Sequence, residues 1–227
     1  GGVMRTTETK EGARIPTPLL HVIASPGGEA SHSTAAAAEL LAAYRERNPA
    51  HLVRTVNVWD LAMPEFDATM IAAKFAVLRT QDASDAQKAQ WARAVAISRA
   101  FNEADRFVFS LPMWNYGVPY RLKHYIDIVT LPGQNWAWSR AEGYQPLLRD
   151  KRAVLVYASA GDFSAEAAAL PGAYADFQKP FMRQWLRFIG VDVVGEVDLA
   201  PTLTDLQRLA QVKEGAAGQA PRAATLL

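Results

Sequence analysis

Apolar residues along the chain fall into short runs and longer stretches with helical spacing. The short runs predict β-strands over residues 19–24, 51–59, 106–111, 153–159 and 191–199. The helical spacing predicts helices over residues 33–48, 83–103, from 119 onward, 173–188 and 203–214. Strands that alternate with helices favour right-handed crossovers. We therefore predict an α/β fold: a three-layer sandwich with a five-stranded parallel sheet, in the strand order 2-1-3-4-5, and helices on both faces.

The chain is predicted to form one domain with a short segment on each side. Residues 18–214 contain all the predicted strands and helices, and no repeat or linker within them indicates a second domain. Residues 1–17 are expected to form a flexible N-terminal arm. Residues 215–227, "GAAGQAPRAATLL", are rich in Ala and Gly and are expected to be a disordered tail.

Composition narrows the classes of partner and chemistry. The 227 residues include 24 Lys and Arg against 23 Asp and Glu, so neither nucleic acid nor an anionic membrane surface is expected as a partner. The chain has no cysteine and its 4 histidines are scattered, so no metal site or cysteine nucleophile is predicted. No stretch reaches the roughly 18 apolar residues of a membrane span. A soluble cytoplasmic protein is expected.

The loop after the first strand, "SPGGEASHS" at residues 25–33, contains two glycines and three serines but no Lys or Arg. A helix N-terminus leaves N–H groups free and carries a partial positive charge, so it favours an anion without a lysine. The glycines allow close approach of the backbone, and the serine hydroxyls are possible donors. Alternatively, Ser31 or Ser33 only caps the following helix. This loop alone does not decide between the two interpretations.

The loop after the third strand, "PMWNYGVP" at residues 112–119, combines aromatic side chains with an amide and a glycine. Trp114 and Tyr116 suit the flat face of a ring, Asn115 can donate to and accept from a heterocycle edge, and Gly117 permits an unusual backbone angle. In open α/β sheets, ligands bind beyond the carboxyl ends of the strands where the strand order reverses, here between the first and third strands. Both unusual loops therefore converge on one predicted crevice.

These two loops, with "GDFS" after the fourth strand and "FMRQWLRFIGV" before the fifth, resemble the FMN-dependent NADH-azoreductases. That family belongs with the flavodoxin-like NAD(P)H:quinone oxidoreductases, for which the crevice rule is well known. The resemblance runs from about Leu19 to Leu199, and its most specific part is "PMWNY" followed by "PYRLKHYID". The chain departs from the family at residues 159–162, where "SAGD" replaces the frequent S-R-G-G. This gain of Asp162 puts the substrate preference in question.

The resemblance implies a site for bound FMN. The phosphate would contact Ser25, Ser31, His32 and Ser33, the isoalloxazine would contact Pro112, Met113, Trp114, Asn115, Tyr116 and Gly117, and its pyrimidine side would contact Ser159, Ala160, Gly161 and Asp162. Trp136 and Trp138 would line the substrate pocket. The family is homodimeric, and each active site is completed by the partner subunit.

The implied activity is two-electron hydride transfer from NADH or NADPH to a small aromatic acceptor, a quinone or an azo compound, by a ping-pong route. No side chain is assigned as catalytic, because the flavin N5 carries the hydride. The main alternative is a flavodoxin-like electron carrier that serves protein partners. A second alternative is an NADPH-dependent flavin or nitroaromatic reductase, and a cofactor-free interaction module would be colourless.

Overall fold

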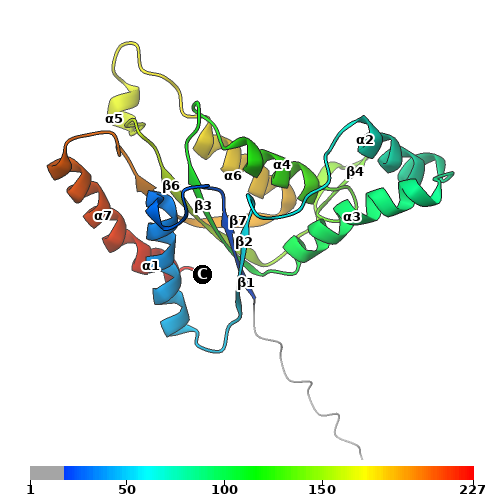
Figure 1. Ribbon diagram of the computed structural model, residues 1–227, viewed down its shortest axis with the longest axis horizontal. Coiled ribbons are helices and arrows are strands. Elements are labelled where there is room, and N and C mark those ends of the chain that lie inside the picture. Colours follow the sequence, from blue (N-terminus) through cyan, green and yellow to red (C-terminus); the bar gives the residue numbers. More distant parts are fainter. Residues whose placement is uncertain (1–17) are drawn as a thin grey trace, which may run out of the picture.

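The computed structural model describes residues 18–227, and the predicted N-terminal arm over residues 1–17 lies outside the described residues. A five-stranded parallel sheet forms the centre of the molecule (Figure 1). Its strands are β1 (Leu19–Ile23), β2 (Val53–Asn57), β3 (Arg106–Pro112), β6 (Lys151–Ala158) and β7 (Val191–Leu199). They lie in the order β2-β1-β3-β6-β7, and each neighbouring pair is parallel. The predicted fold class and strand order are confirmed.

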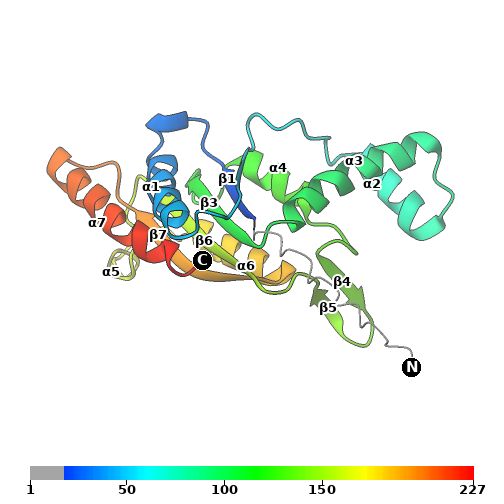
Figure 2. The same cartoon turned by 90° about the horizontal axis from the view of Figure 1, so that it is seen from below.

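Helices cover both faces of this sheet (Figures 1 and 2). On one face lie α1 (His32–Arg47) and α7 (Leu206–Ala224). On the other lie α3 (Asp85–Asn102), α4 (Tyr120–Val129) and α6 (Gln178–Ile189). Successive strand residues point to opposite faces, so the continuous apolar runs of β1, β3 and β6 supply both cores.

Several smaller elements were absent from the sequence-based expectations. The helix α2 (Ala68–Phe75) and a π-helical turn (Ala76–Thr80) follow a segment that reads as a loop. The strands β4 (Trp136–Ser139) and β5 (Gly143–Pro146) form an antiparallel hairpin. A 3-10 turn (Gly28–Ala30) precedes α1, and the four-residue helix α5 (Ala165–Ala168) follows β6. These elements are short, so periodicity over a window of 11–18 residues does not detect them.

The prediction of a disordered tail over residues 215–227 is wrong. The helix α7 continues to Ala224, and its side chains Ala216, Ala220 and Ala223 are buried in the core cluster that α1 also forms. Alanine has the highest helix propensity, and its small side chain allows two helices to pack closely. Residues 215–224 have a composition that is typical of disorder, but they form a packed helix because α1 offers a surface against which their alanines can pack.

The helix α6 begins at Gln178, five residues later than the predicted start at 173. The side chain of Asp176 accepts hydrogen bonds from the backbone N–H groups of Gln178 at 2.7 Å and Lys179 at 3.1 Å. A carboxylate that accepts the first free N–H groups of a helix fixes where the helix starts. The residues before Asp176 are consequently available to line the functional site.

Candidate functional site

The loops after β1, β3 and β6 leave the sheet at the same edge, from three neighbouring strands (Figure 1). Backbone hydrogen bonds continue the pairing into the loops: Ala24 N donates to Ser110 O at 3.0 Å, and Met113 N donates to Ala158 O at 2.8 Å. The two loops singled out from the sequence therefore start side by side. The loop after β6 lies next to the second of them.

The first loop combines a helix cap with free N–H groups. Ser31 caps α1, because its Oγ accepts from Thr34 N at 3.4 Å and lies 3.2 Å from Ser33 Oγ. Gly28 has a φ of 57°, in the left-handed region that favours glycine. Among residues 18–227, no acceptor is found for the N–H groups of His32 and Ser33. The cap is thus confirmed for Ser31, and two N–H groups remain available to an anion.

Two other hydroxyls belong to this part of the site. Ser25 is buried, and its Oγ accepts from Gly27 N at 3.3 Å, which leaves its own proton free to donate. Thr34 Oγ1 is buried and has no hydrogen-bond partner within the described part of the chain. Burying an unpaired hydroxyl is costly, so Thr34 is a further candidate ligand of a bound anion. Sequence reasoning missed it, although it stands directly after the serines.

The second loop is a tight turn from Trp114 to Gly117. The backbone groups of these two residues exchange hydrogen bonds at 3.1 Å and 3.0 Å. The two central residues have positive φ, 49° for Asn115 and 67° for Tyr116, as a type I′ turn requires. The expectation that Gly117 carries the unusual angle is therefore wrong, because the strained positions are the two before it. Such strain in non-glycine residues is typical of functional sites.

Three contacts hold this turn in place. Phe177 N donates to Tyr116 O at 2.8 Å, so the segment before α6 is tied to the turn. The indole of Trp59 packs against Trp114 with ring centroids 5.7 Å apart, and its Nε1 donates to Ala24 O at 2.8 Å. Trp59 thereby connects the first and second loops. It follows β2, and nothing in its sequence neighbourhood indicated this role.

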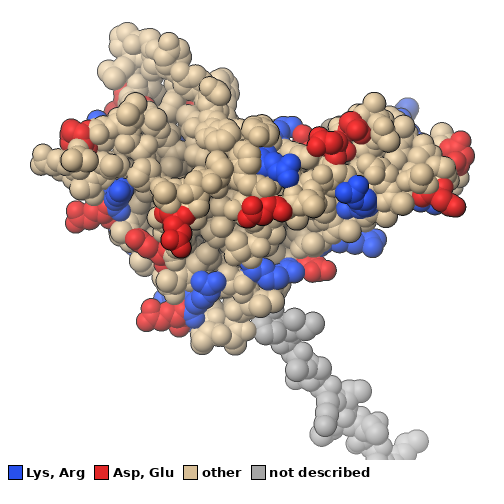
Figure 3. Space-filling model, in the orientation of Figure 1, with Lys and Arg blue, Asp and Glu red and all other residues tan. Residues whose placement is uncertain are grey.

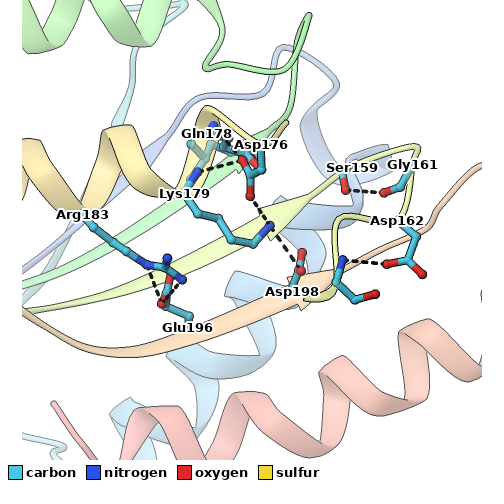
Figure 4. Close-up of polar contacts among 11 residues, drawn as sticks. Ser159, Gly161, Asp162, Asp176, Gln178, Lys179, Arg183, Glu196 and Asp198 are labelled. Atoms are coloured by element: carbon cyan, nitrogen blue, oxygen red, sulfur yellow. Dashed lines mark hydrogen bonds and ion pairs between the residues drawn. The ribbon is translucent and has the colours of Figure 1, made fainter. Parts of the chain in front are cut away.

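The third loop presents a fixed carboxylate. Ser159 Oγ donates to Gly161 O at 2.8 Å, which closes the loop directly after β6. Asp162 Oδ1 accepts from Ser164 N at 2.9 Å (Figure 4). Asp162 Oδ2 lies 3.5 Å from an Arg208 nitrogen. The hydrogen bonds from Ser164 lower the pKa of Asp162 below its usual value, and Arg208 acts in the same direction. Asp162 is therefore ionised at neutral pH.

A cavity of about 590 Å³ lies between the second and third loops. Phe163 and residues of the 167–174 segment line it, together with six of the predicted site residues: Met113, Asn115, Tyr116, Ala160, Gly161 and Asp162. This volume is in the range typical of small-molecule and cofactor sites. Ser31 and His32 instead line a smaller hollow of about 220 Å³ between α1 and α7.

The structure does not bring Trp136 and Trp138 to this cavity. Trp136 lies on the β4–β5 hairpin, packs against Tyr144 and Phe188 at 5.7 Å, and lines a separate groove of about 610 Å³. Trp138 is 59% exposed and points from the same hairpin. Within one subunit, the predicted substrate-pocket residues are thus separate from the predicted flavin residues.

An ionic network connects the start of α6 to β7 (Figure 4). The ammonium group of Lys179 lies between two carboxylates, 3.2 Å from Asp176 and 3.3 Å from Asp198, and 5.0 Å from the centre of the Tyr157 ring. One turn further along α6, Arg183 makes a bidentate contact with Glu196 of β7. This network anchors the start of α6 to the edge strand, and with it the residues that line the cavity.

Comparison with known proteins agrees with this architecture. The family described as "Flavodoxin-like fold" matches residues 17–220. An "FMN-dependent NADH:quinone oxidoreductase" of Desulfotalea psychrophila is 37% identical over 187 residues, which are 82% of this chain and 86% of that protein. An "FMN-dependent NADH:quinone oxidoreductase 3" of Pseudomonas fluorescens is 36% identical over 206 residues, covering 88% of this chain and 95% of that protein. The fold thus defines a flavodoxin-like protein.

Among solved structures, an azoreductase from Bacillus anthracis strain Sterne superposes with a TM-score of 0.82 at 23% identity, over 93% of this chain and all of that one. The FMN complex of an FMN-dependent NADH-azoreductase from the Ames Ancestor strain of the same species gives a TM-score of 0.81 at 21% identity, over 92% and 98% of the two chains. These two likenesses concern the fold. The sequence relatives show the family: the chain belongs to the FMN-dependent NADH:quinone oxidoreductase/azoreductase family.

Among the described residues, no helix has both the length and the apolar character needed to cross a membrane. The cytoplasmic location expected from the sequence stays a prediction.

Proposed function

We infer that this protein is an FMN-dependent NADH:quinone oxidoreductase that also accepts azo compounds. The observation that carries this proposal is the meeting of three loops at one sheet edge, where a loop with free N–H groups and no Lys or Arg adjoins a strained aromatic turn and a cavity of about 590 Å³. The names of the relatives specify FMN, NADH and quinones. An electron carrier for protein partners needs no such cavity beside the turn.

The residues present fit FMN at both of its ends. For the phosphate, the free N–H groups of His32 and Ser33, the buried hydroxyl of Ser25 and the unpartnered hydroxyl of Thr34 are all donors, and an anion needs donors only. For the ring, the turn at 112–117 supplies aromatic side chains and backbone groups, and the loop at 159–162 faces it across the cavity. We propose that these groups hold the cofactor.

Bound there, FMN would supply the two-electron chemistry, so that NADH, one proton and a quinone become NAD⁺ and a hydroquinone. The side chains of the protein bind and orient the reactants: the rigid turn with Tyr116 fixes the plane against which flat molecules stack. Backbone N–H groups of the loops would stabilise negative charge on the bound cofactor. We assign no side chain as a general acid or base.

We further propose that two copies of the chain form a homodimer in which each site is shared. The groove that contains Trp136 also exposes Tyr144, Phe181 and Phe188, and it adjoins a second hollow lined by Phe177 and Tyr120. A second copy seated on this aromatic surface would bury it and bring the hairpin tryptophans near a cavity that they do not reach within their own subunit.

The first test is an absorbance spectrum of the purified protein after incubation with FMN and gel filtration. We expect the bands of oxidised flavin, their bleaching by NADH without oxygen, and their return when a quinone is added. The variant Ser33→Glu should lose FMN because it sets a negative charge beside the phosphate, whereas Glu39→Gln, on the same helix but beyond the loop, should retain it. A wild-type protein that takes up no FMN would contradict the proposal.

A further inference from the structure

The cavity beside the turn contains one charged side chain. Its lining is made of apolar, aromatic and small residues, and Asp162 alone among them carries a charge. Among residues 18–227, no Lys, Arg or His lines it. The projecting segment around α5, which forms its outer wall, likewise presents few charged side chains on the face seen in Figure 3. The electrostatic character of the cavity is therefore set by this carboxylate.

Aromatic rings accompany that carboxylate. Tyr116 lies between two other rings, with its centroid 6.2 Å from that of Phe163 and 5.4 Å from that of Tyr174. All three residues line the cavity, and Tyr116 and Tyr174 are 41% and 73% exposed. The face of an aromatic ring carries negative potential and attracts a cation, most strongly when several rings surround it. The three rings and the carboxylate all attract positive charge, so the site favours a cation.

The carboxylate is held in a fixed position. Ser164 N donates to Asp162 Oδ1 at 2.9 Å, and Arg208, from the first turn of α7, approaches Oδ2 at 3.5 Å. Arg208 does not line the cavity, so the negative member of the pair is the one that a bound molecule meets. The guanidinium reduces the field of the carboxylate without reversing it. Removing Arg208 would strengthen that field, and removing the charge of Asp162 would abolish it.

We propose that this cavity selects flat acceptors that carry a positive charge and disfavours anionic ones, with Asp162 and the rings of Tyr116, Phe163 and Tyr174 as the determinants. The inference rests on the proposed function, because Tyr116 and Asp162 are also assigned to FMN. An acceptor would meet them together with Phe163 and the segment at 167–174, which extend the lining beyond the residues assigned to FMN. Uncharged quinones should bind more weakly than cationic acceptors and more tightly than anionic ones. The expected substrates are quinones or azo dyes that bear a quaternary ammonium group or a cationic heteroaromatic ring.

The binding test uses redox-inert probes and the oxidised, FMN-loaded protein without NADH. Isothermal titration calorimetry would compare N-methylquinolinium with naphthalene sulfonate, which have similar size and opposite charge. We expect the cation to bind about tenfold more tightly. Tyr174→Leu should lower the affinity for the cation by about threefold and leave the affinity for the sulfonate unchanged, because only the cation interacts with the face of that ring.

The kinetic test uses protein reduced beforehand with limiting NADH and mixed rapidly with a naphthoquinone that carries either a trimethylammonium group or a sulfonate. The readout is the ratio of the two second-order rate constants, in which a general loss of activity cancels. Asp162→Asn should lower this ratio about fivefold, and Arg208→Gln should raise it about twofold. Glu166→Gln is the matched control, because it removes a carboxylate from α5 that does not line the cavity, and the ratio should stay constant.

The possible failures are distinguishable. Protein that binds no FMN, or that NADH does not reduce, would overturn the proposed function. Protein that is loaded and reduced but shows equal rates for both naphthoquinones, or a ratio that responds alike to Asp162→Asn and Glu166→Gln, would overturn only this inference. A ratio that falls in Arg208→Gln would also overturn it, because that variant retains the carboxylate.

Discussion

At the scale of single residues, the conformation of Asn115 is the feature that most restricts substitution. Its φ of 49° lies in the left-handed region, which asparagine tolerates and β-branched residues avoid. We expect Asn115→Val to lower the free energy of unfolding by about 2 kcal/mol, and Asn115→Gly to change it by less than about 0.5 kcal/mol. Urea unfolding of both variants measures this. Equal losses would mean that the side-chain amide matters to stability and the backbone conformation does not.

His21 makes stability depend on pH, mainly because its side chain is buried. It lies in β1, is 4% exposed, and its Nε2 is 2.8 Å from Ser110 Oγ. Burial lowers the pKa of His21 from 6.5 to about 4, and Arg45 acts in the same direction. Above pH 6.5 both the folded and the unfolded chain hold a neutral imidazole. Between pH 6.5 and 4 only the unfolded chain takes up the proton, so the stability falls as the pH falls.

The expected loss attributable to His21 is about 3 kcal/mol between pH 7 and pH 4. Carboxylates also titrate in this range, so the measurement is the difference between the wild type and His21→Gln, whose amide can still bond to Ser110. Urea unfolding at several pH values should give curves that converge as the pH falls. Parallel curves would contradict this explanation.

At the scale of secondary-structure elements, the start of α6 depends on Lys179. Its side chain is 13% exposed and lies between the carboxylates of Asp176 and Asp198, while Asp176 also caps the helix. Lys179→Met would leave two carboxylates close together without their shared cation, so we expect a loss of about 2 kcal/mol in the free energy of unfolding. Lys88→Met removes the same charge from an exposed position in α3 and should cost less than about 0.5 kcal/mol.

A second measurement separates local from global effects in Lys179→Met. Because Phe177 N bonds to Tyr116 O, loosening the start of α6 should also increase hydrogen exchange of the Phe177 amide more than that of strand amides in β3. A uniform increase would indicate that the network stabilises the whole domain and does not specifically hold the turn.

Some secondary-structure elements and loops could be predicted from the sequence, and others could not. Strong periodicity identified the five strands and their order. The loops after β1 and β3 were singled out because their composition is unusual for connectors, and the structure places both at one edge of the sheet. The helix over residues 215–224 was missed because its alanines are indistinguishable from a disordered segment until α1 is placed beside them. Trp59 could not be predicted because its role depends on a contact with Ala24, which is distant along the chain. Thr34 could not be predicted because only the structure shows that its buried hydroxyl has no partner among the described residues.

At the scale of the whole molecule, the residues proposed for the substrate pocket and those proposed for FMN lie apart within a single chain. The residues proposed to hold FMN and the charged cavity lie at the carboxyl edge of the sheet, whereas the aromatic groove is lined by Trp136 and Tyr144 of the β4–β5 hairpin. Figure 2 shows this hairpin on the opposite side of the sheet from α5. An exposed groove of several aromatic side chains is more than an isolated surface hydrophobe and indicates a partner.

A homodimer therefore should depend on this groove. Tyr144 is 64% exposed and lines it, so Tyr144→Glu places a charge in the proposed interface without removing a buried core side chain. We expect the variant to dissociate at concentrations at least about tenfold higher than the wild type, measured by analytical ultracentrifugation. Leu206→Glu, at an 85% exposed position that starts α7, makes the same kind of change elsewhere and should remain dimeric. A monomeric wild type would rule out the dimer, and equal dissociation of both variants would move the interface to another face.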